Sequence, residues 1–118
     1  MQLTLHSDDG ACLHMRLKGR VTQKELPAQE DLFVKNLGPE AYARKVLLDM
    51  QDSEFLDSSG VSWLLVSHKR FRERGGQIVL HSIPPLVGNV LKVLRMNQIF
   101  AMAENEQAAM KLVQGESA

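Results

Sequence analysis

The sequence has a single cysteine, few aromatic residues and no net charge. Cys12 alone cannot form an internal disulfide or a cysteine-rich metal site, which suits a reducing cytoplasm. Its 14 basic and 14 acidic residues cancel, so no overall field attracts nucleic acid or an anionic membrane surface. The apolar runs are too short to cross a bilayer, and the N-terminus lacks the apolar core of an export signal. We therefore expect a cytoplasmic protein with no direct nucleic-acid contact and no membrane insertion.

The 118 residues fit one domain over 1–118, with a core over about 3–113. Apolar alternation on both sides of Asp8-Asp9-Gly10 predicts an N-terminal β-hairpin with Leu3 and Leu5 on its buried face. The almost unbroken apolar run from Lys45 to Met50 is typical of a central strand that is covered on both faces. Two further strands are predicted at Gln77 to His81 and, at an edge, Ile99 to Met102.

Helical spacing predicts about four helices between and after these strands. Thr22 and Glu25 have the spacing of a capping box, so we expect a first helix from about Gln23 to Asn36. A second helix follows a loop over Gln51 to Leu56 and ends at Gly75-Gly76. The remaining features are a helix that opens at Pro84-Pro85 with Leu86, Val90, Leu91 and Leu94 on one face, a helix from about Asn105, and a tail over Gly115 to Ala118. The prediction is an α/β domain with a small mixed sheet of four to five strands.

The stretch Asp57-Ser58-Ser59-Gly60 stands between two apolar runs, directly before the second predicted helix. The structural interpretation is a helix cap, in which a side-chain oxygen accepts from a free backbone N–H. The functional interpretation is that Ser58 is exposed at the end of a strand, where a helix N-terminus favours added negative charge such as a phosphate. The residues alone leave both interpretations open.

Catalytic interpretations of this stretch fit less well. A hydrolase serine would need a glycine two residues before it, and neither Ser58 nor Ser59 has one. There is no phosphate-binding glycine loop, and a phospho-accepting Asp57 would need an acidic cluster to hold Mg²⁺. The four histidines are scattered without the spacing of a zinc site. We therefore expect no enzyme and no metal site.

Two features of the second predicted helix have a structural and a functional interpretation. Trp63 lies one position off the apolar stripe, so it either packs between helices or, with Val66, projects as an interface anchor. The basic run from His68 to Arg74 is interpreted as a solvated helix end, because cations suit the negative end of the helix dipole. A nucleic-acid patch is the alternative.

The segment from Leu47 to Phe100 resembles the STAS domain, specifically the bacterial anti-sigma factor antagonists. The matching motifs are F-L-D-S-S-G opening a helix, R-G-G before a strand, a proline-bearing turn and an ending in I-F. The resemblance implies that Ser58 is phosphorylated by an anti-sigma factor that is also a serine kinase and that uses the ATP itself, so the chain needs no cofactor. It further implies that the unphosphorylated protein binds this partner and frees a sigma factor, that a phosphatase restores it, and that the chain is a monomer or a weak dimer.

The sequence departs from the family at two places. Family members often carry G-E-L-D after the second strand, where this chain has Gly19-Arg20-Val21-Thr22, and Ser62-Trp63 follows the glycine motif where a small glycine is usual. Both changes predict a different partner surface. The expected partner-binding residues are Arg20, Thr22, Asp57, Ser59, Gly60, Ser62 and Trp63. The alternative is a STAS subunit of a membrane transport complex, or another STAS assembly, without a phosphorylation switch.

Overall fold

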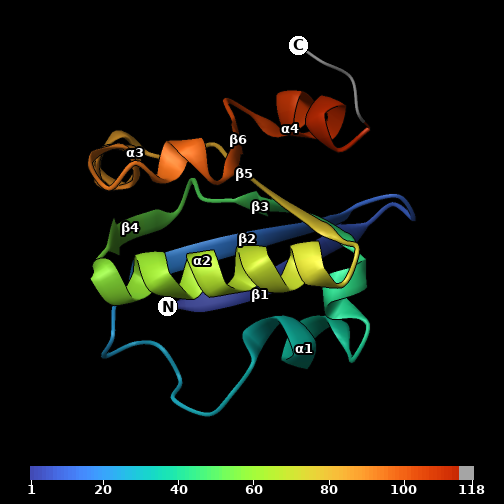
Figure 1. Cartoon of the computed structure of the whole chain (residues 1–118), viewed down its shortest axis with the longest axis horizontal. Helices are drawn as coiled ribbons and strands as arrows, with labels where there is room; N and C mark the ends of the chain where they lie inside the picture. The colour runs from blue at the N-terminus through green and yellow to red at the C-terminus, as the bar shows by residue number, and fades with distance from the viewer. Residues whose placement is uncertain (115–118) are drawn as a thin grey trace.

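A six-stranded mixed sheet organises the computed structural model, which describes residues 1–114 (Figure 1). The main path runs β1 (Gln2–Asp8), β2 (Leu13–Val21), β3 (Lys45–Asp49), β5 (Gln77–His81) and β6 (Ala101–Ala103). A further strand, β4 (Ser53–Leu56), pairs with the C-terminal part of β2. Only the β1–β2 pair is antiparallel. The predicted hairpin and the α/β class are confirmed, but the sheet has one or two more strands than expected.

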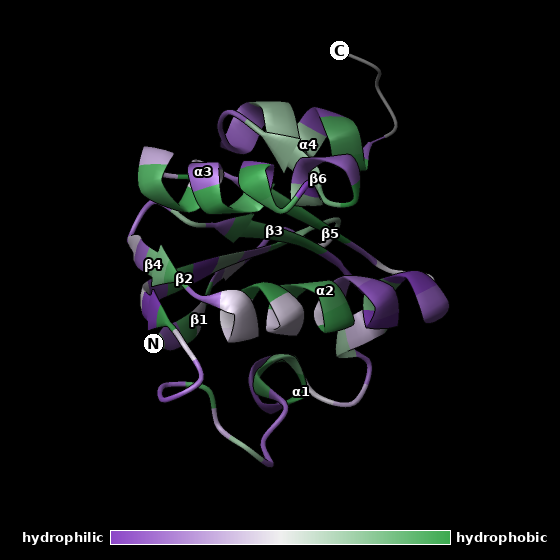
Figure 2. Ribbon diagram, turned by 60° about the vertical axis from the view of Figure 1, so that its left-hand side comes forward, coloured by the Kyte–Doolittle hydropathy of each residue, from purple (hydrophilic) through white to green (hydrophobic). Residues whose placement is uncertain are grey.

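Four α-helices cover the two faces of this sheet. They are α1 (Leu32–Leu37), α2 (Ser58–Glu73), α3 (Pro85–Val93) and α4 (Glu106–Val113), with short 3₁₀ turns η1 (Ala41–Ala43) and η2 (Met96–Gln98). Figures 1 and 2 place α2 on one face of the sheet, with α1 outside it, and α3 and α4 on the other face. Among the described residues no helix is long and apolar enough to cross a membrane.

Strand β3 is central, as its apolar run predicts. Val46, Leu47 and Leu48 are all fully buried, because helices cover both faces of the strand. Val46 and Leu48 belong to the larger core, which includes Phe71 of α2. Leu47 packs with Ala109 and Val113 of α4 in a smaller core on the opposite face.

The first helix is shorter than predicted and starts elsewhere. It begins after Asp31, whose carboxylate caps it, and Thr22 opens only a turn in which its carbonyl accepts from the N–H groups of Glu25 and Leu26. The capping-box prediction is therefore wrong. Pro27 is the physical reason, because it lacks an N–H and disfavours helical geometry at the residue before it.

Three smaller expectations are also corrected. The predicted loop Gln51 to Leu56 contains β4. Leu5 is 43% exposed, because β1 is an edge strand that the helices cover only in part. On α3 the buried residues are Val87 and Leu91, whereas Leu86 and Leu94 of the predicted apolar face are exposed. The predicted tail over 115–118 lies outside the described residues.

Candidate functional site

The candidate site lies where β2 and β4 end and α2 begins. Asp57 has extended backbone geometry and is the N-cap of α2. One carboxylate oxygen, Oδ1, accepts from the Gly60 N–H at 2.9 Å, and Oδ2 accepts from the Gln23 N–H at 3.1 Å. These hydrogen bonds, first of all the one from Gly60, hold the pKa of Asp57 below its usual value. Asp57 therefore fixes both the start of α2 and the loop that follows β2.

Gly60 is required by a close approach of two backbones. A Cβ atom built on it would lie 2.2 Å from the carbonyl oxygen of Val21, at the end of β2, and 3.0 Å from Leu56 Cδ2. No side chain fits there without moving the strand or the helix. The D-S-S-G motif thus has a structural basis at its two ends, an acid that caps the helix and a glycine that lets the helix touch the sheet.

Ser58 and Ser59, the two serines between Asp57 and Gly60, do not cap the helix. Ser58, the first residue of α2, is exposed, and among residues 1–114 its hydroxyl takes part in no hydrogen bond. Ser62 is also exposed and lies four residues further along the helix, so both side chains are on the same face. Ser59 is half-buried. The helix N-terminus next to Ser58 provides partly positive N–H groups that favour an anion.

Arg20 lies beside this helix start, on the neighbouring strand. It pairs with Phe55 across β2 and β4, and its guanidinium carbon is 5.3 Å from the centroid of the Phe55 ring. This is the geometry of a cation–π contact. Phe55 was not among the predicted site residues, because β4 was predicted to be a loop. The four residues Ser53 to Leu56 do not alternate between apolar and polar, so the local sequence contained no signal for this strand.

The predicted partner residues are thus brought together at one end of the molecule. We call this exposed or half-exposed set the α2 tip surface; its members are Arg20, Thr22, Phe55, Asp57, Ser58, Ser59 and Ser62. Gly60 lies buried beneath it. Asp52, which precedes β4, and Glu54, which lies on it, are both exposed and line a surface hollow together with Lys18.

Trp63 has mainly a packing role. Its ring stacks on Phe33 of α1 with centroids 5.6 Å apart and an interplanar angle of 14°. The side chain is half-buried, so only part of its surface is open to a partner. Of the two interpretations of Trp63 from sequence, the structure places it between helices α1 and α2.

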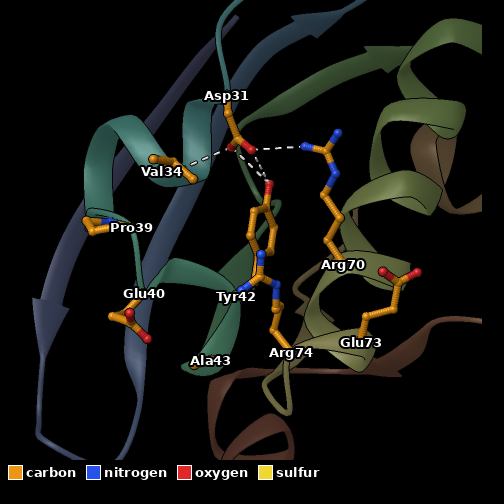
Figure 3. Close-up of a pocket in the computed structure, with 9 residues that line it drawn as sticks. All are labelled: Asp31, Val34, Pro39, Glu40, Tyr42, Ala43, Arg70, Glu73 and Arg74. Carbon is orange, nitrogen blue, oxygen red and sulfur yellow. Dashed lines mark hydrogen bonds and ion pairs between the residues drawn. The ribbon is translucent and has the colours of Figure 1, made fainter.

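A second polar cluster lies at the other end of α2, around Asp31 (Figure 3). The Asp31 carboxylate accepts from the N–H groups of Phe33 and Val34, from the Tyr42 hydroxyl at 2.8 and 2.9 Å, and from Arg70 Nη1 at 2.9 Å. Burial, first of all, raises the pKa of Tyr42 to about 12. The cluster lines a cavity of about 430 Å³ together with Glu40, Glu73 and Arg74. Because it joins α1, η1 and α2, we interpret it as structural.

Two histidines lie close together beside α4. His14 has Nε2 at 2.9 Å from Asp9 Oδ2 and Nδ1 at 2.7 Å from Glu106 Oε1. His81 is 3% exposed, and burial, more than any nearby charge, lowers its pKa. Within residues 1–114, no group of three His, Cys, Asp or Glu side chains is placed to hold a metal ion.

Comparisons with known proteins agree with this geometry. Residues 5–104 match a family model described as "Mlab, STAS domain". A curated relative, described as an anti-sigma factor antagonist and named BtrV, from Bordetella bronchiseptica, is 29% identical over 115 residues, which is 92% of this chain and 91% of that protein.

Solved structures show the same fold. An anti-sigma factor antagonist from Thermotoga maritima superposes with a TM-score of 0.81 at 17% identity, covering 95% of this chain and 94% of that one. The unphosphorylated form of the anti-sigma factor antagonist SpoIIAA superposes with a TM-score of 0.70 at 21% identity, covering 99% of this chain and 100% of that one.

Proposed function

Because this chain belongs to the STAS domain family, we propose that it is an anti-sigma factor antagonist switched by phosphorylation of Ser58. The observation that carries the proposal is the position of Ser58, which is exposed, free of hydrogen bonds within residues 1–114, and first in a helix. A kinase can therefore reach the hydroxyl without unfolding the domain. The relatives described as anti-sigma factor antagonists support the same role.

Phosphorylation is expected to change binding and to leave the fold intact. A phosphate adds about −1.5 to −2 charges at one surface point. The N-terminus of α2 favours this charge, so the helix tolerates it. Asp57, the preceding residue, is also an acid, so this part of the α2 tip surface would become strongly acidic. A partner that fits the unphosphorylated surface would then be repelled.

The proposed cycle takes place in the cytoplasm. The unphosphorylated protein binds an anti-sigma factor that is also a serine kinase, which releases a sigma factor and thereby regulates transcription. The kinase transfers phosphate from its own ATP to Ser58 and dissociates, and a phosphatase restores the serine. In this cycle the chain is substrate and ligand, and needs neither a cofactor nor a catalytic residue.

Arg20 and Phe55 indicate what kind of partner surface fits. The guanidinium lies over an aromatic ring and is exposed, so it presents a positively charged, partly apolar platform. An acidic or aromatic side chain of the partner suits this platform. This is the place where many family members have an acid, and we propose that Arg20 selects a partner with complementary charge.

The direct test is phosphorylation by anti-sigma kinases encoded by genes next to this one. We expect mass spectrometry after incubation with kinase and ATP to show one phosphate, on Ser58. Ser62→Ala is the matched control, because it removes an exposed serine on the same helix face and should leave phosphorylation unchanged. Phosphate that persists in Ser58→Ala would overturn the assignment.

The second candidate function is a STAS subunit of a membrane transport complex without phosphorylation. The observation that favours it is Arg20, which replaces the usual acid of the antagonists at the partner surface. In that case Ser58 would only shape the loop. Co-purification with a transporter ATPase or permease, unaffected by Ser58→Asp, would support this second candidate over the first.

A further inference from the structure

We propose that a hollow between the C-terminal half of α2 and the edge strand β6 binds an extended segment of a partner protein that carries an apolar side chain and a carboxylate. The hollow has a volume of about 320 Å³. Its lining comes from three parts of the chain, namely His68, Phe71 and Arg72 of α2, Gly76 to Ile78 around the start of β5, and Ile99 and Ala101 around the start of β6. The site is distinct from the proposed switch, because Arg72 lies about 20 Å along the helix axis from Ser58.

The sheet is open beside this hollow. Among the described residues, β6 is the last strand of the main path and pairs only with β5. The register of this pair begins at Val79 and Ala101, whereas β3 pairs with β5 from Gln77 onwards. Gln77 and Ile78 therefore have a strand neighbour on the β3 side only, and both line the hollow. An extended segment bound there would continue the sheet, in the way that partner strands add to open sheet edges.

Much of the lining is apolar. Phe71 is fully buried and Ile78 is 3% exposed, so both side chains are fixed in the core of the domain. Ile99 is 43% exposed and lines the same hollow. An apolar side chain of a partner, such as Leu or Phe, would pack against all three. Side chains that fill a hollow of this kind are the usual anchors of protein interfaces.

Arg72 determines which polar group fits beside the apolar side chain. Of the described residues that line the hollow, Arg72 alone carries a permanent charge, and none is an acid. It is exposed and forms no ion pair within residues 1–114. His68 is uncharged near neutral pH, because burial and then the charge of Arg72 lower its pKa. A carboxylate is the group that matches an unpaired guanidinium, since it accepts two parallel hydrogen bonds.

The charges around the hollow do not cancel Arg72. Lys69 and Glu73 lie with Arg72 around a neighbouring hollow on the same helix, where one acid thus faces two cations. Before β6, the nearest charge along the chain is that of Arg95. The acid after it, Glu104, follows the end of β6 that is remote from the hollow. The surroundings are therefore basic and favour an acidic segment.

The test is an NMR titration of the isotope-labelled full chain with two short peptides. The probe is acetyl-Thr-Phe-Thr-Glu-Thr-amide, in which an extended backbone places the Phe and Glu side chains on one face. The matched control peptide has Gln in place of Glu. We expect the probe to bind with a dissociation constant of roughly 1 mM and the control to bind about fivefold more weakly. The amide signals of Gly76 to Ile78 and of Ala101 should shift.

Charge reversal tests the role of Arg72. Arg72→Glu should remove the preference for the Glu peptide and favour a peptide with Lys at that position. Lys92→Glu is the matched control, because Lys92 is an exposed cation on α3, which covers the other face of the sheet, and its change should leave binding unaltered. Ser58→Asp should also leave binding unaltered, so failure of this site and failure of the proposed switch are distinguishable. A thermal melt of each variant checks that it is folded.

Three results would overturn the proposal, namely no saturable shift around the hollow up to about 10 mM peptide, equal binding of the Glu and Gln peptides, or shifts confined to the α2 tip surface. Phenylpropanoate presents the same ring and a carboxylate without a peptide backbone. If it binds at the same residues as tightly as the probe, the hollow is a site for free carboxylates, and the proposal of a protein segment is overturned as well.

Discussion

The two ends of α2 differ in how they are built. At the N-terminal end, Ser58 and Ser62 are exposed, and the Asp57 carboxylate and the absence of a side chain on Gly60 hold the helix start in place. Towards the C-terminal end, Phe71 is fully buried and packs edge-to-face against the rings of Phe33 and Tyr42. The ring centroids are 5.3 Å and 4.9 Å from that of Phe71, respectively.

This difference separates stability from recognition along a single helix. The aromatic end buries large rings, each of which contributes several kcal/mol to folding. The tip is held by the Asp57 cap and the Gly60 contact, whereas the hydroxyls of Ser58 and Ser62 contribute little to folding and are open to a partner. A negative charge can therefore be added and removed at the tip while the other end keeps the domain folded.

The largest effect is expected where the tip touches the sheet. Gly60→Ala places a methyl group 2.2 Å from the Val21 carbonyl oxygen, so either the strand or the helix must move. We expect the free energy of unfolding to fall by about 1–3 kcal/mol in urea denaturation. Gly88→Ala, a helical glycine whose added Cβ meets only an ordinary contact at 3.6 Å, should not destabilise the domain. Equal losses in both variants would contradict the close-approach explanation.

A smaller effect is expected at the other end of the helix. Tyr42→Phe removes the hydroxyl that donates to Asp31 and keeps the ring, so stability should fall by about 1–2 kcal/mol. In this variant the Asp31 carboxylate still accepts hydrogen bonds from Arg70 and from two backbone N–H groups. The measured loss therefore reports on the Tyr42 hydroxyl.

The same variant gives a pH test with a defined sign. Burial raises the pKa of Tyr42 from 10.0 to about 12, so the unfolded chain releases this proton at lower pH than the folded one. The contribution of Tyr42 is fully present below pH 10 and is lost as the pH rises through about 12, by about 3 kcal/mol. Wild-type stability should therefore fall more steeply than that of Tyr42→Phe in this window. Parallel curves would show that the hydroxyl is not buried in the way described.

The smallest effect on stability is expected at Ser58. Ser58→Asp places a charge at an exposed position in the first turn of α2, where the helix dipole favours it, so stability should stay within about 0.5 kcal/mol. Binding to the anti-sigma kinase, measured by isothermal titration calorimetry, should be lost. Ser58→Ala should bind as the wild type does. A Ser58→Asp protein that binds at full strength would contradict the switch.

Much of the fold could be predicted from local sequence. The turn at Asp8-Asp9-Gly10, the apolar run of β3 and the proline at the start of α3 each act over a few residues, and the predicted elements are in the structure. The D-S-S-G stretch could be interpreted for the same reason, since capping and phosphate tolerance both depend on the neighbouring N–H groups.

What could not be predicted depends on long-range packing. Strand β4 is short and becomes regular only because β2 is long enough to pair with β3 along one half and with β4 along the other. That pairing also determines the contact between Arg20 and Phe55, which are 35 positions apart in sequence. The start of α1 depends on Asp31, which is held by Tyr42 and Arg70 from other elements.

The two aspartates that cap α1 and α2 have a consequence for the segment between β2 and α1. Asp57 holds the beginning of this segment at Gln23, and Asp31 holds its end through Arg70, so both ends are attached to α2. Ala28, Gln29 and Glu30 in between are exposed and belong to no helix or strand. Evolution or a protein engineer can therefore lengthen or replace this stretch without altering the sheet, and so change the surface displayed beside α2 while the domain itself stays the same.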